Sequence, residues 1–411
     1  MRIAGFIISL MLCCQSLSAQ DSTHFSYSEV TDMLVKQRFI DRYENVFMTK
    51  VPTRHMVKIG AEFAASGYLD PAYGRQSLLL NVGYEVKLLP SFSLGLNFKA
   101  NGGYSSALGW EGVLVANMQG RWYFDMNQRI AKGKSANNFS GNYLAVVGER
   151  YWQSYLSTYP KLKTGIEFGM QRRFFNNGAI DFAAGVYYMR YAEIHTSWEY
   201  VSGNNKINDF EISTRTMLSF AFGDWKRKST SPACDVFRCD EFVSSQWKFL
   251  WPVIRISSNI SNISLGAGYE KKLGKSPFSV NAQIFADYNS FIYRNFYDFS
   301  LSRSESAQLQ TFAQMRYFFL QKKRIRRGRG GNNLSGLFIG PHADYVLYTT
   351  TGYYSNRNTK HFGVGFTYGY QKALFKNGYI DISGAQSFDV LPNQKGDGRL
   401  STFRVGFGLS I

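Results

Sequence analysis

Two polar residues in one loop have the types and the spacing of a hydrolase site. His195 and Ser197 lie two positions apart, so on an extended strand their side chains share one face. The carboxylates of Glu199 and Asp209 follow and could orient the imidazole. That would complete a serine–histidine–acid set, in which the imidazole activates the serine hydroxyl as a nucleophile. Chance also supplies such spacing in polar loops, so the alternative is a loop histidine beside a serine.

A limited resemblance accompanies this set. The H-x-S sequence formed by His195 and Ser197, near the outer end of a late strand, resembles that of some outer-membrane lipid A deacylases. The match covers only these residues and a carboxylate, and the corresponding loop of the second half has no comparable pair. It implies a lipid-modifying serine hydrolase, which stands as the second of two functional hypotheses.

The remaining residue types give no signal for a metal or a cofactor. The chain has five histidines, and no two of them have a metal-ligand spacing. Cys234 and Cys239 are the cysteines that remain after the N-terminal segment is removed, and they lack the second pair of a zinc site. In an oxidising compartment we expect them to form a disulfide, with two free thiols as the alternative.

Basic residues are concentrated in one turn. Six lysines and arginines lie between Lys322 and Arg329, and Arg129, Lys132 and Lys134 occupy a matching turn earlier in the chain. With a formal net charge of +18, nucleic acid is one interpretation. An exported protein rarely meets nucleic acid, whereas each basic residue near an anionic membrane surface contributes about 1 kcal/mol. We therefore predict outer-membrane lipids as partners, and no nucleic acid.

The N-terminus predicts export. Arg2 precedes an apolar run from Phe6 to Leu12, and Leu17-Ser18-Ala19 form a small-residue cleavage site. The run is too short to span a membrane, because a spanning helix needs about 18 apolar residues or more. We expect residues 1–19 to be a cleaved signal peptide and residues 20–52 to be a periplasmic segment.

The chain also repeats itself. Residues 121–141 (RWYFDMNQRIAKGKSANNFSG) align without a gap with residues 316–336 (RYFFLQKKRIRRGRGGNNLSG), and 9 of 21 positions are identical. RRFFNNGAID from Arg172 is followed 200 residues later by KALFKNGYID from Lys372. The pattern predicts two homologous repeats, at 53–225 and 251–411, joined by a linker at 226–250 that holds the cysteine pair.

Apolar and polar residues alternate with a period of two in both repeats. From Leu80 to Lys87, for example, Leu80, Val82, Tyr84 and Val86 share one face, and polar residues or glycine occupy the other. Such segments begin near 55, 76, 92, 113, 139, 161, 178 and 207, and again near 252, 263, 278, 304, 334, 358, 378 and 400. Many exceed the usual length of soluble strands. Aromatic residues are 17% of the chain. We predict an all-β fold: a transmembrane antiparallel β-barrel of about 16 strands from two eight-strand repeats.

The doubled segment, the short F-NNG-ID hairpin and the alternating C-terminus resemble those of a group of Bacteroidota outer-membrane β-barrel proteins. The resemblance covers most of residues 53–411, but its motifs are structural. It implies a location and a fold and no activity.

The number of barrels remains open at this stage. The long linker favours two eight-stranded barrels, whereas one sixteen-stranded barrel needs no contact between two barrels and is slightly favoured. In two small barrels the polar face would form an ion-paired, filled interior, and in one wide barrel it would line water. The residues expected to face the lumen in the first repeat are Glu85, Lys87, Arg121, Glu167, Arg173, Asp181 and Arg215.

These features together predict an integral outer-membrane protein assembled by the barrel-assembly machinery. The leading functional hypothesis is a structural or passive-pore role for small solutes, and not an enzyme. The alternative is the serine hydrolase built on His195, Ser197 and Asp209. The sequence does not define an oligomeric state.

Overall fold

The computed structural model describes most of the chain after its N-terminal segment. The residues described are 54–65, 76–105, 109–131, 139–153, 160–174, 178–191, 208–223, 243–274, 276–294, 301–321, 323, 334–352, 356–375, 377–390 and 399–410. The expected signal peptide, the periplasmic segment, His195, Ser197, Cys234 and Cys239 lie outside these residues, so their predicted roles stay predictions.

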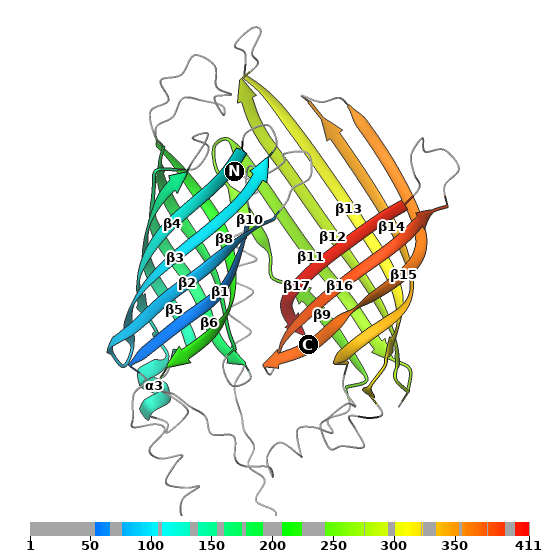
Figure 1. Ribbon diagram of the computed structural model, residues 1–411, viewed down its shortest axis with the longest axis horizontal. Coiled ribbons are helices and arrows are strands. Elements are labelled where there is room, and N and C mark those ends of the chain that lie inside the picture. Colours follow the sequence, from blue (N-terminus) through cyan, green and yellow to red (C-terminus); the bar gives the residue numbers. More distant parts are fainter. Residues whose placement is uncertain are drawn as a thin grey trace, which may run out of the picture. The chain divides into compact units, whose positions relative to one another are not determined.

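The first eight strands form a closed antiparallel barrel, called barrel 1 below (Figure 1). Each strand pairs with the next, and β1 also pairs with β8, from Met56 opposite Gly223 to Ala64 opposite Arg215. The strands are β1 (His55–Ala65), β2 (Gln76–Leu89), β3 (Phe92–Ser105), β4 (Gly109–Trp122), β5 (Gly141–Gln153), β6 (Leu162–Phe174), β7 (Gly178–Arg190) and β8 (Asn208–Gly223). One short helix, α3 (Met126–Ala131), follows β4.

Nine more strands follow outside barrel 1 (Figure 1). They are β9 (Ser245–Leu250), β10 (Val253–Ile256), β11 (Ile260–Lys272), β12 (Phe278–Arg294), β13 (Leu301–Phe318), β14 (Gly336–Thr351), β15 (Arg357–Phe375), β16 (Gly378–Asp389) and β17 (Arg399–Ser410). Strands β11 to β17 pair in order, and β9 pairs with both β11 and β17. These pairings join β9 and β11–β17 in a second ring of eight strands, called ring 2 below.

A single sixteen-stranded barrel, the slightly favoured expectation, is therefore wrong. The pairing of β1 with β8 satisfies the edges of the first eight strands before the second repeat begins. The expected linker at 226–250 ends in strand β9, whose six residues supply the first strand of ring 2. The starts expected in the first repeat lie within four residues of the observed ones.

The alternation in the sequence corresponds to the two faces of the sheet. In β2, Asn81 and Glu85 are at most 1% exposed, whereas Leu80 and Val82 are 66% and 54% exposed. The polar residues face the interior, and the apolar residues face outward. This arrangement is the reverse of that in a soluble barrel, and it repeats on the strands of ring 2, where Phe366 and Phe403 are 66% and 74% exposed.

Strand β10 belongs to neither ring alone. Strands β9 and β10 both pair with β11. Around Trp251 and Pro252, the segment between them has one residue more than the part of β11 that it faces. Proline has no backbone N–H for a ladder hydrogen bond, so a strand is readily interrupted there. Beyond the interruption, Arg255 and Ile256 pair with Ser213 and Ile212 of β8, above the point where β1 ends. β10 thus bridges β8 of barrel 1 and β11 of ring 2.

Two ends of each ring are distinguished below. The turn end carries the connections after β2, β4 and β6, and after β11, β13 and β15. The loop end carries the connections after β3, β5 and β7, and after β12, β14 and β16. In the described part of the chain no helix is long and apolar enough to cross a membrane.

Candidate functional site

A fully buried polar cluster occupies the turn end of barrel 1. Arg121 donates to Asp181 at 2.6 Å and to Gln171 at 2.7 Å, and Lys58 Nζ lies 2.8 Å from Glu85. The guanidinium of Arg121 also stacks on the ring of Tyr143 at 4.4 Å. The five residues Lys58, Glu85, Arg121, Gln171 and Asp181, called the Arg121 cluster below, come from five strands. Because every charge has a counter-charge in contact, this end of the barrel is filled and electrically balanced.

Ring 2 has the same constellation at its turn end. Arg316 donates to Asp381 at 2.8 Å and to Gln371 at 2.6 Å, and Lys248 Nζ lies 2.5 Å from Glu270. Phe338 stacks on Arg316 at 4.0 Å, as Tyr143 does on Arg121. The members of this Arg316 cluster are Lys248, Glu270, Arg316, Gln371 and Asp381. In both rings they come from the first, second, fourth, sixth and seventh strands in the order of pairing.

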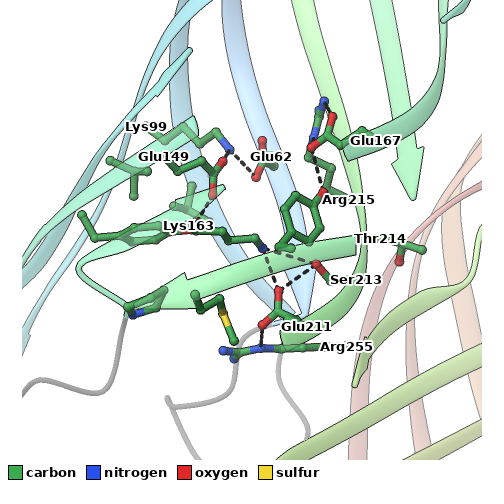
Figure 2. A pocket seen from close by; sticks show the side chains of 16 residues that line it. Glu62, Lys99, Glu149, Lys163, Glu167, Glu211, Ser213, Thr214, Arg215 and Arg255 are labelled. Atoms are coloured by element: carbon green, nitrogen blue, oxygen red, sulfur yellow. Dashed lines mark hydrogen bonds and ion pairs between the residues drawn. The ribbon is translucent and has the colours of Figure 1, made fainter. Parts of the chain in front are cut away.

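The loop-end half of barrel 1 is filled by a second set of ion pairs (Figure 2). Lys99 Nζ lies 2.9 Å from Glu62 and 2.8 Å from Glu149. Glu211 accepts from Lys163 at 2.7 Å and from Arg255 of β10, also at 2.7 Å. Deeper in, Arg215 donates to Glu167 at 2.7 Å. The cavity left among these groups is about 80 Å³, enough for only a few water molecules.

The residues that the sequence assigned to the lumen of the first repeat are placed as follows. Glu85, Lys87, Arg121, Glu167, Asp181 and Arg215 are buried within barrel 1. Arg173 is partly buried and donates to the carbonyl of Ala221 near the turn end. Asp209, the acid of the hydrolase hypothesis, accepts from the backbone N–H and the hydroxyl of Ser258 at 3.2 and 2.9 Å. It therefore holds the turn between β10 and β11.

Among the described residues, the loop-end half of ring 2 lacks most of the ion pairs found in barrel 1. Residues of barrel 1 can be matched with residues of ring 2 by counting positions along each strand from the turn-end clusters. In each ring one serine donates to the glutamate of the turn-end cluster. The residue six positions after this serine is Lys99 in barrel 1 and Phe285 in ring 2. Four residues before the cluster arginine, barrel 1 has Asn117 and ring 2 has Phe312. Four residues before the cluster glutamine, Glu167 is matched by Thr367.

Arg404 shows this difference between the two rings most clearly. It lies opposite Ser383 in the register of β16 and β17, as Arg215 lies opposite Ala183 in that of β7 and β8. Its guanidinium is 4.0 Å from the ring centre of Phe285 and 4.5 Å from that of Phe312, and it donates to Gln310. In the described part of the chain, no carboxylate lies within 4.0 Å of it. Arg404 is thus a recessed cation held by aromatic rings and an amide.

A second polar group lies nearer the loop end of ring 2. Asp344 is 3.3 Å from Nε2 of His342 and 3.6 Å from Nε2 of His361, whose Nδ1 is 3.1 Å from Asp389. Gly363 lies between them, because a Cβ there would be 2.7 to 2.8 Å from polar atoms of His361, Ser387 and Asp344. Among the described residues, no set of three or more His, Cys, Asp or Glu side chains is arranged to hold a metal ion.

A cavity of about 340 Å³ passes from the interior of ring 2 to its outer surface at the seam between β17 and β11. Its lining includes the inward residues Arg404 and Asp287 and the outward residues Phe403 and Leu265. The seam exists because β9 pairs with β17 over three residues only, and Leu250, the last of them, lies against Gly266 and Gly406. Beyond Leu250 the chain leaves for β8. We call this space the lateral cavity.

Barrel 1 contributes to the outer mouth of the lateral cavity. Phe63 and Thr216, on the outward faces of β1 and β8, are among its lining residues. Trp251 packs on Phe182 of β7 at 5.1 Å between ring centres, and its backbone N–H donates to the carbonyl of Phe407. The mouth is therefore apolar and the interior end is polar, so the cavity suits a molecule with one apolar and one polar part.

Comparison with known proteins assigns the chain to no family. No family model matches the chain, and no curated protein matches it. Among solved structures, a bacterial polysaccharide outer membrane secretin is 9% identical, with 88% of this chain and 98% of that chain covered and a TM-score of 0.35. The CymD monoaromatic hydrocarbon channel is 9% identical, with 90% of each chain covered and a TM-score of 0.21.

A third match is OmpT, an outer membrane protein of Vibrio cholerae. It is 8% identical, with 87% of this chain and 95% of that chain covered and a TM-score of 0.23. Similarity at these scores identifies no relative.

Sequence reasoning did not find the residues of the lateral cavity. Arg404 lies in the alternating C-terminal strand, where the pattern marks it as inward but says nothing of its missing partner. Trp251-Pro252 was a usable signal, because proline marks a strand end or an interruption. Arg255 contacts Glu211 only because β10 pairs with β8, and no local sequence pattern indicates this pairing.

Proposed function

We propose that this chain is an integral outer-membrane protein in which barrel 1 is a filled structural anchor and ring 2 binds an amphiphilic molecule through its lateral cavity. The membrane location is supported by the reversed faces of the sheet. Outward residues such as Val146 and Phe210 are 68% and 67% exposed, while the interior contains buried ion pairs. Large exposed apolar surfaces are rare on soluble monomers, whereas an outer-membrane barrel needs them facing lipid.

We infer that the two rings derive from one duplicated eight-strand unit. The support is the placement of the Arg121 and Arg316 clusters on equivalent strands, with matching roles for each residue type. The repeated sequence segments contribute the central arginine of each cluster. The duplication would have provided one ring for stability and released the other for binding.

The single observation that carries the binding function is that the lateral cavity is lined by residues from both faces of β17. Arg404 points inward and Phe403 points outward, and both line the same space. A closed wall would separate these side chains. The cavity therefore offers a route between the surrounding lipid and the interior of ring 2 that does not cross the loop end.

A passive pore is less well supported than binding. Any solute crossing either ring from end to end would have to displace the Arg121 or the Arg316 cluster, whose central arginines are at most 1% exposed. Breaking a buried ion pair costs about 3–5 kcal/mol, so open channels would be rare. The hydrolase hypothesis built on His195 and Ser197 stays a prediction.

A labelling experiment with matched positions tests the lateral route. Ser383 of ring 2 and Ala183 of barrel 1 occupy the same place, opposite Arg404 and Arg215 respectively. Ser383→Cys and Ala183→Cys variants, in a background where Cys234 and Cys239 are replaced by serine, are reconstituted in phosphatidylcholine vesicles. A pyrene maleimide dissolved in the bilayer should label the Ser383→Cys variant and not the Ala183→Cys variant.

Heat-modifiable gel mobility shows that both variants are folded before labelling. Equal labelling of the two positions, or failure to label the Ser383→Cys variant, would overturn the lateral route. A wild-type product that partitions with soluble proteins would overturn the membrane location as well.

A further inference from the structure

Arg404 has features of a binding group that its counterpart in barrel 1 lacks. Arg215 is saturated, with Glu167 at 2.7 Å and Asp181 at 3.7 Å. Arg404 occupies the corresponding place in ring 2, yet it contacts the amide oxygen of Gln310 and two aromatic rings. A guanidinium has five N–H donors in a planar fork that fits a carboxylate or a phosphate.

We propose that the lateral cavity takes an amphiphile with an anionic head group and a single apolar chain, and that Arg404 binds the head group. This inference rests on the proposed lateral binding function and names the class of molecule that it serves. Because threonine stands at position 367, where barrel 1 has Glu167, no described carboxylate lies within 4.0 Å of Arg404, and Asp287 and Asp381 line the same cavity without contacting it. A buried charge is costly without a counter-ion, and an anionic ligand supplies one.

The rings of Phe285 and Phe312 restrict the position of the Arg404 guanidinium. Its central carbon lies 4.0 and 4.5 Å from the two ring centres, and its N–H groups lie in the guanidinium plane. The contact with Gln310 uses one edge of this plane. A pre-oriented fork loses little side-chain entropy on binding, which favours affinity for a planar anion.

The apolar chain is accommodated by the rest of the lining. From Arg404 the cavity continues past Leu250 and Phe407 to the outward residues Leu265 and Phe403 and to Phe63 of barrel 1. Phe63 and Phe407 lie 5.2 Å apart between ring centres, so one continuous apolar surface connects ring 2 with barrel 1. A head group at Arg404 would therefore direct its chain outward through the seam to the lipid.

Asp287 limits the charge of the head group. It lines the same cavity as Arg404 and lies on β12, beside the ring that stacks on the guanidinium. A carboxylate that lines the same cavity opposes a second negative charge on the ligand. We therefore expect a singly charged head group, such as a carboxylate, to bind more tightly than a doubly charged phosphate monoester.

The test is a binding series with the full chain in detergent micelles. Dodecanoate, dodecyl phosphate, dodecanol and dodecyltrimethylammonium are titrated against wild type, Arg404→Gln and the control Arg303→Gln, which removes a rim arginine whose side chain is 56% exposed. A hydrogen bond to a charged group contributes about 1.5–3 kcal/mol, so Arg404→Gln should weaken dodecanoate binding about tenfold to a hundredfold. Dodecanol affinity should be unchanged, and Arg303→Gln should match wild type for every probe.

Each outcome bears on one claim. If dodecanol and dodecanoate bind equally to wild type, and Arg404→Gln alters neither, the head-group inference is wrong while lateral binding stands. If no probe binds and the Ser383→Cys variant is not labelled from the bilayer, the proposed function itself fails. If acetate alone binds as tightly as dodecanoate, the site serves a small anion, and the amphiphile is excluded. Tighter binding of dodecyltrimethylammonium than of dodecanoate would make Asp287, not Arg404, the recognising group.

Discussion

Barrel 1 and ring 2 have nearly the same interior at the turn end and different interiors at the loop end. At the turn end both have a lysine, a glutamate, an arginine, a glutamine and an aspartate in contact. Toward the loop end, barrel 1 continues with Lys99, Glu149 and Glu167, whereas ring 2 has Phe285, Asp344 and Thr367. The comparison separates a turn-end interior that the two rings share from a loop-end interior in which they differ. The difference is clearest at Arg404, which has no carboxylate in contact among the described residues.

The largest expected effect comes from breaking the shared cluster where it is most connected. Asp181 accepts from Arg121 at 2.6 Å and from Tyr143 at 2.5 Å, and it faces Arg215, so Asp181→Ala leaves two buried arginines short of counter-charge. We expect a loss of about 3–5 kcal/mol in the free energy of unfolding. Asp381→Ala should cost less, because Asp381 Oδ1 has no hydrogen-bond partner among the described residues. Urea unfolding in vesicles measures both, and equal losses would contradict this difference.

An exchange at one position tests whether the missing carboxylate creates the binding site. Thr367→Glu should place a carboxylate near Arg404, as Glu167 is placed near Arg215. The new ion pair should compete with an anionic ligand, so dodecanoate affinity should fall about tenfold, for a competing interaction of roughly 1.4 kcal/mol. Thr367→Gln is the uncharged control and should retain binding. Full dodecanoate affinity in Thr367→Glu would show that Arg404 does not meet the head group.

A loss of stability smaller than that of Asp181→Ala is expected where the two loop-end halves both have a carboxylate. Glu149 accepts from Lys99 at 2.8 Å and from Tyr151 at 2.5 Å, so Glu149→Gln should lower the free energy of unfolding by about 1–3 kcal/mol. Neither oxygen of Asp344 has a hydrogen-bond partner among the described residues, and its neighbours are imidazoles. Asp344→Asn should therefore change stability by less than Glu149→Gln does. Denaturant titration at neutral pH gives both values, and the opposite order would contradict the prediction.

Much of the fold was predictable because a membrane barrel imposes a period of two over long segments. Leu80 to Lys87 already show which residues face outward. The number of barrels was not predictable. It depends on whether β8 pairs with β1 or with the next strand, and the sequence pattern of β8 is the same in both cases. The polar residues of the first repeat could be assigned to an interior, but their partners come from strands far apart in the chain. Lys58 and Gln171, for example, are 113 positions apart.

The candidate site was harder to predict than the fold. Arg404 differs from Arg215 in lacking a carboxylate partner. That difference is visible only once the two clusters are known, because Thr367 and Glu167 each lie four residues before the glutamine of their cluster. The seam depends on where β9 ends. That point is set by Leu250 fitting against two glycines and by the proline that follows, and neither feature has a periodic signature.

The bridging position of β10 has a consequence for the order of folding. Its pairing with β8 uses Ser213 and Ile212, which become a defined edge only once β1 has paired with the lower part of β8. Arg255 also needs Glu211 already in place, because a guanidinium buried early would lack its counter-ion. The N-terminal half should thus close first and serve as a template on which the second ring begins. The C-terminal half, expressed alone, would start assembly with an unanchored strand and should fold slowly or not at all.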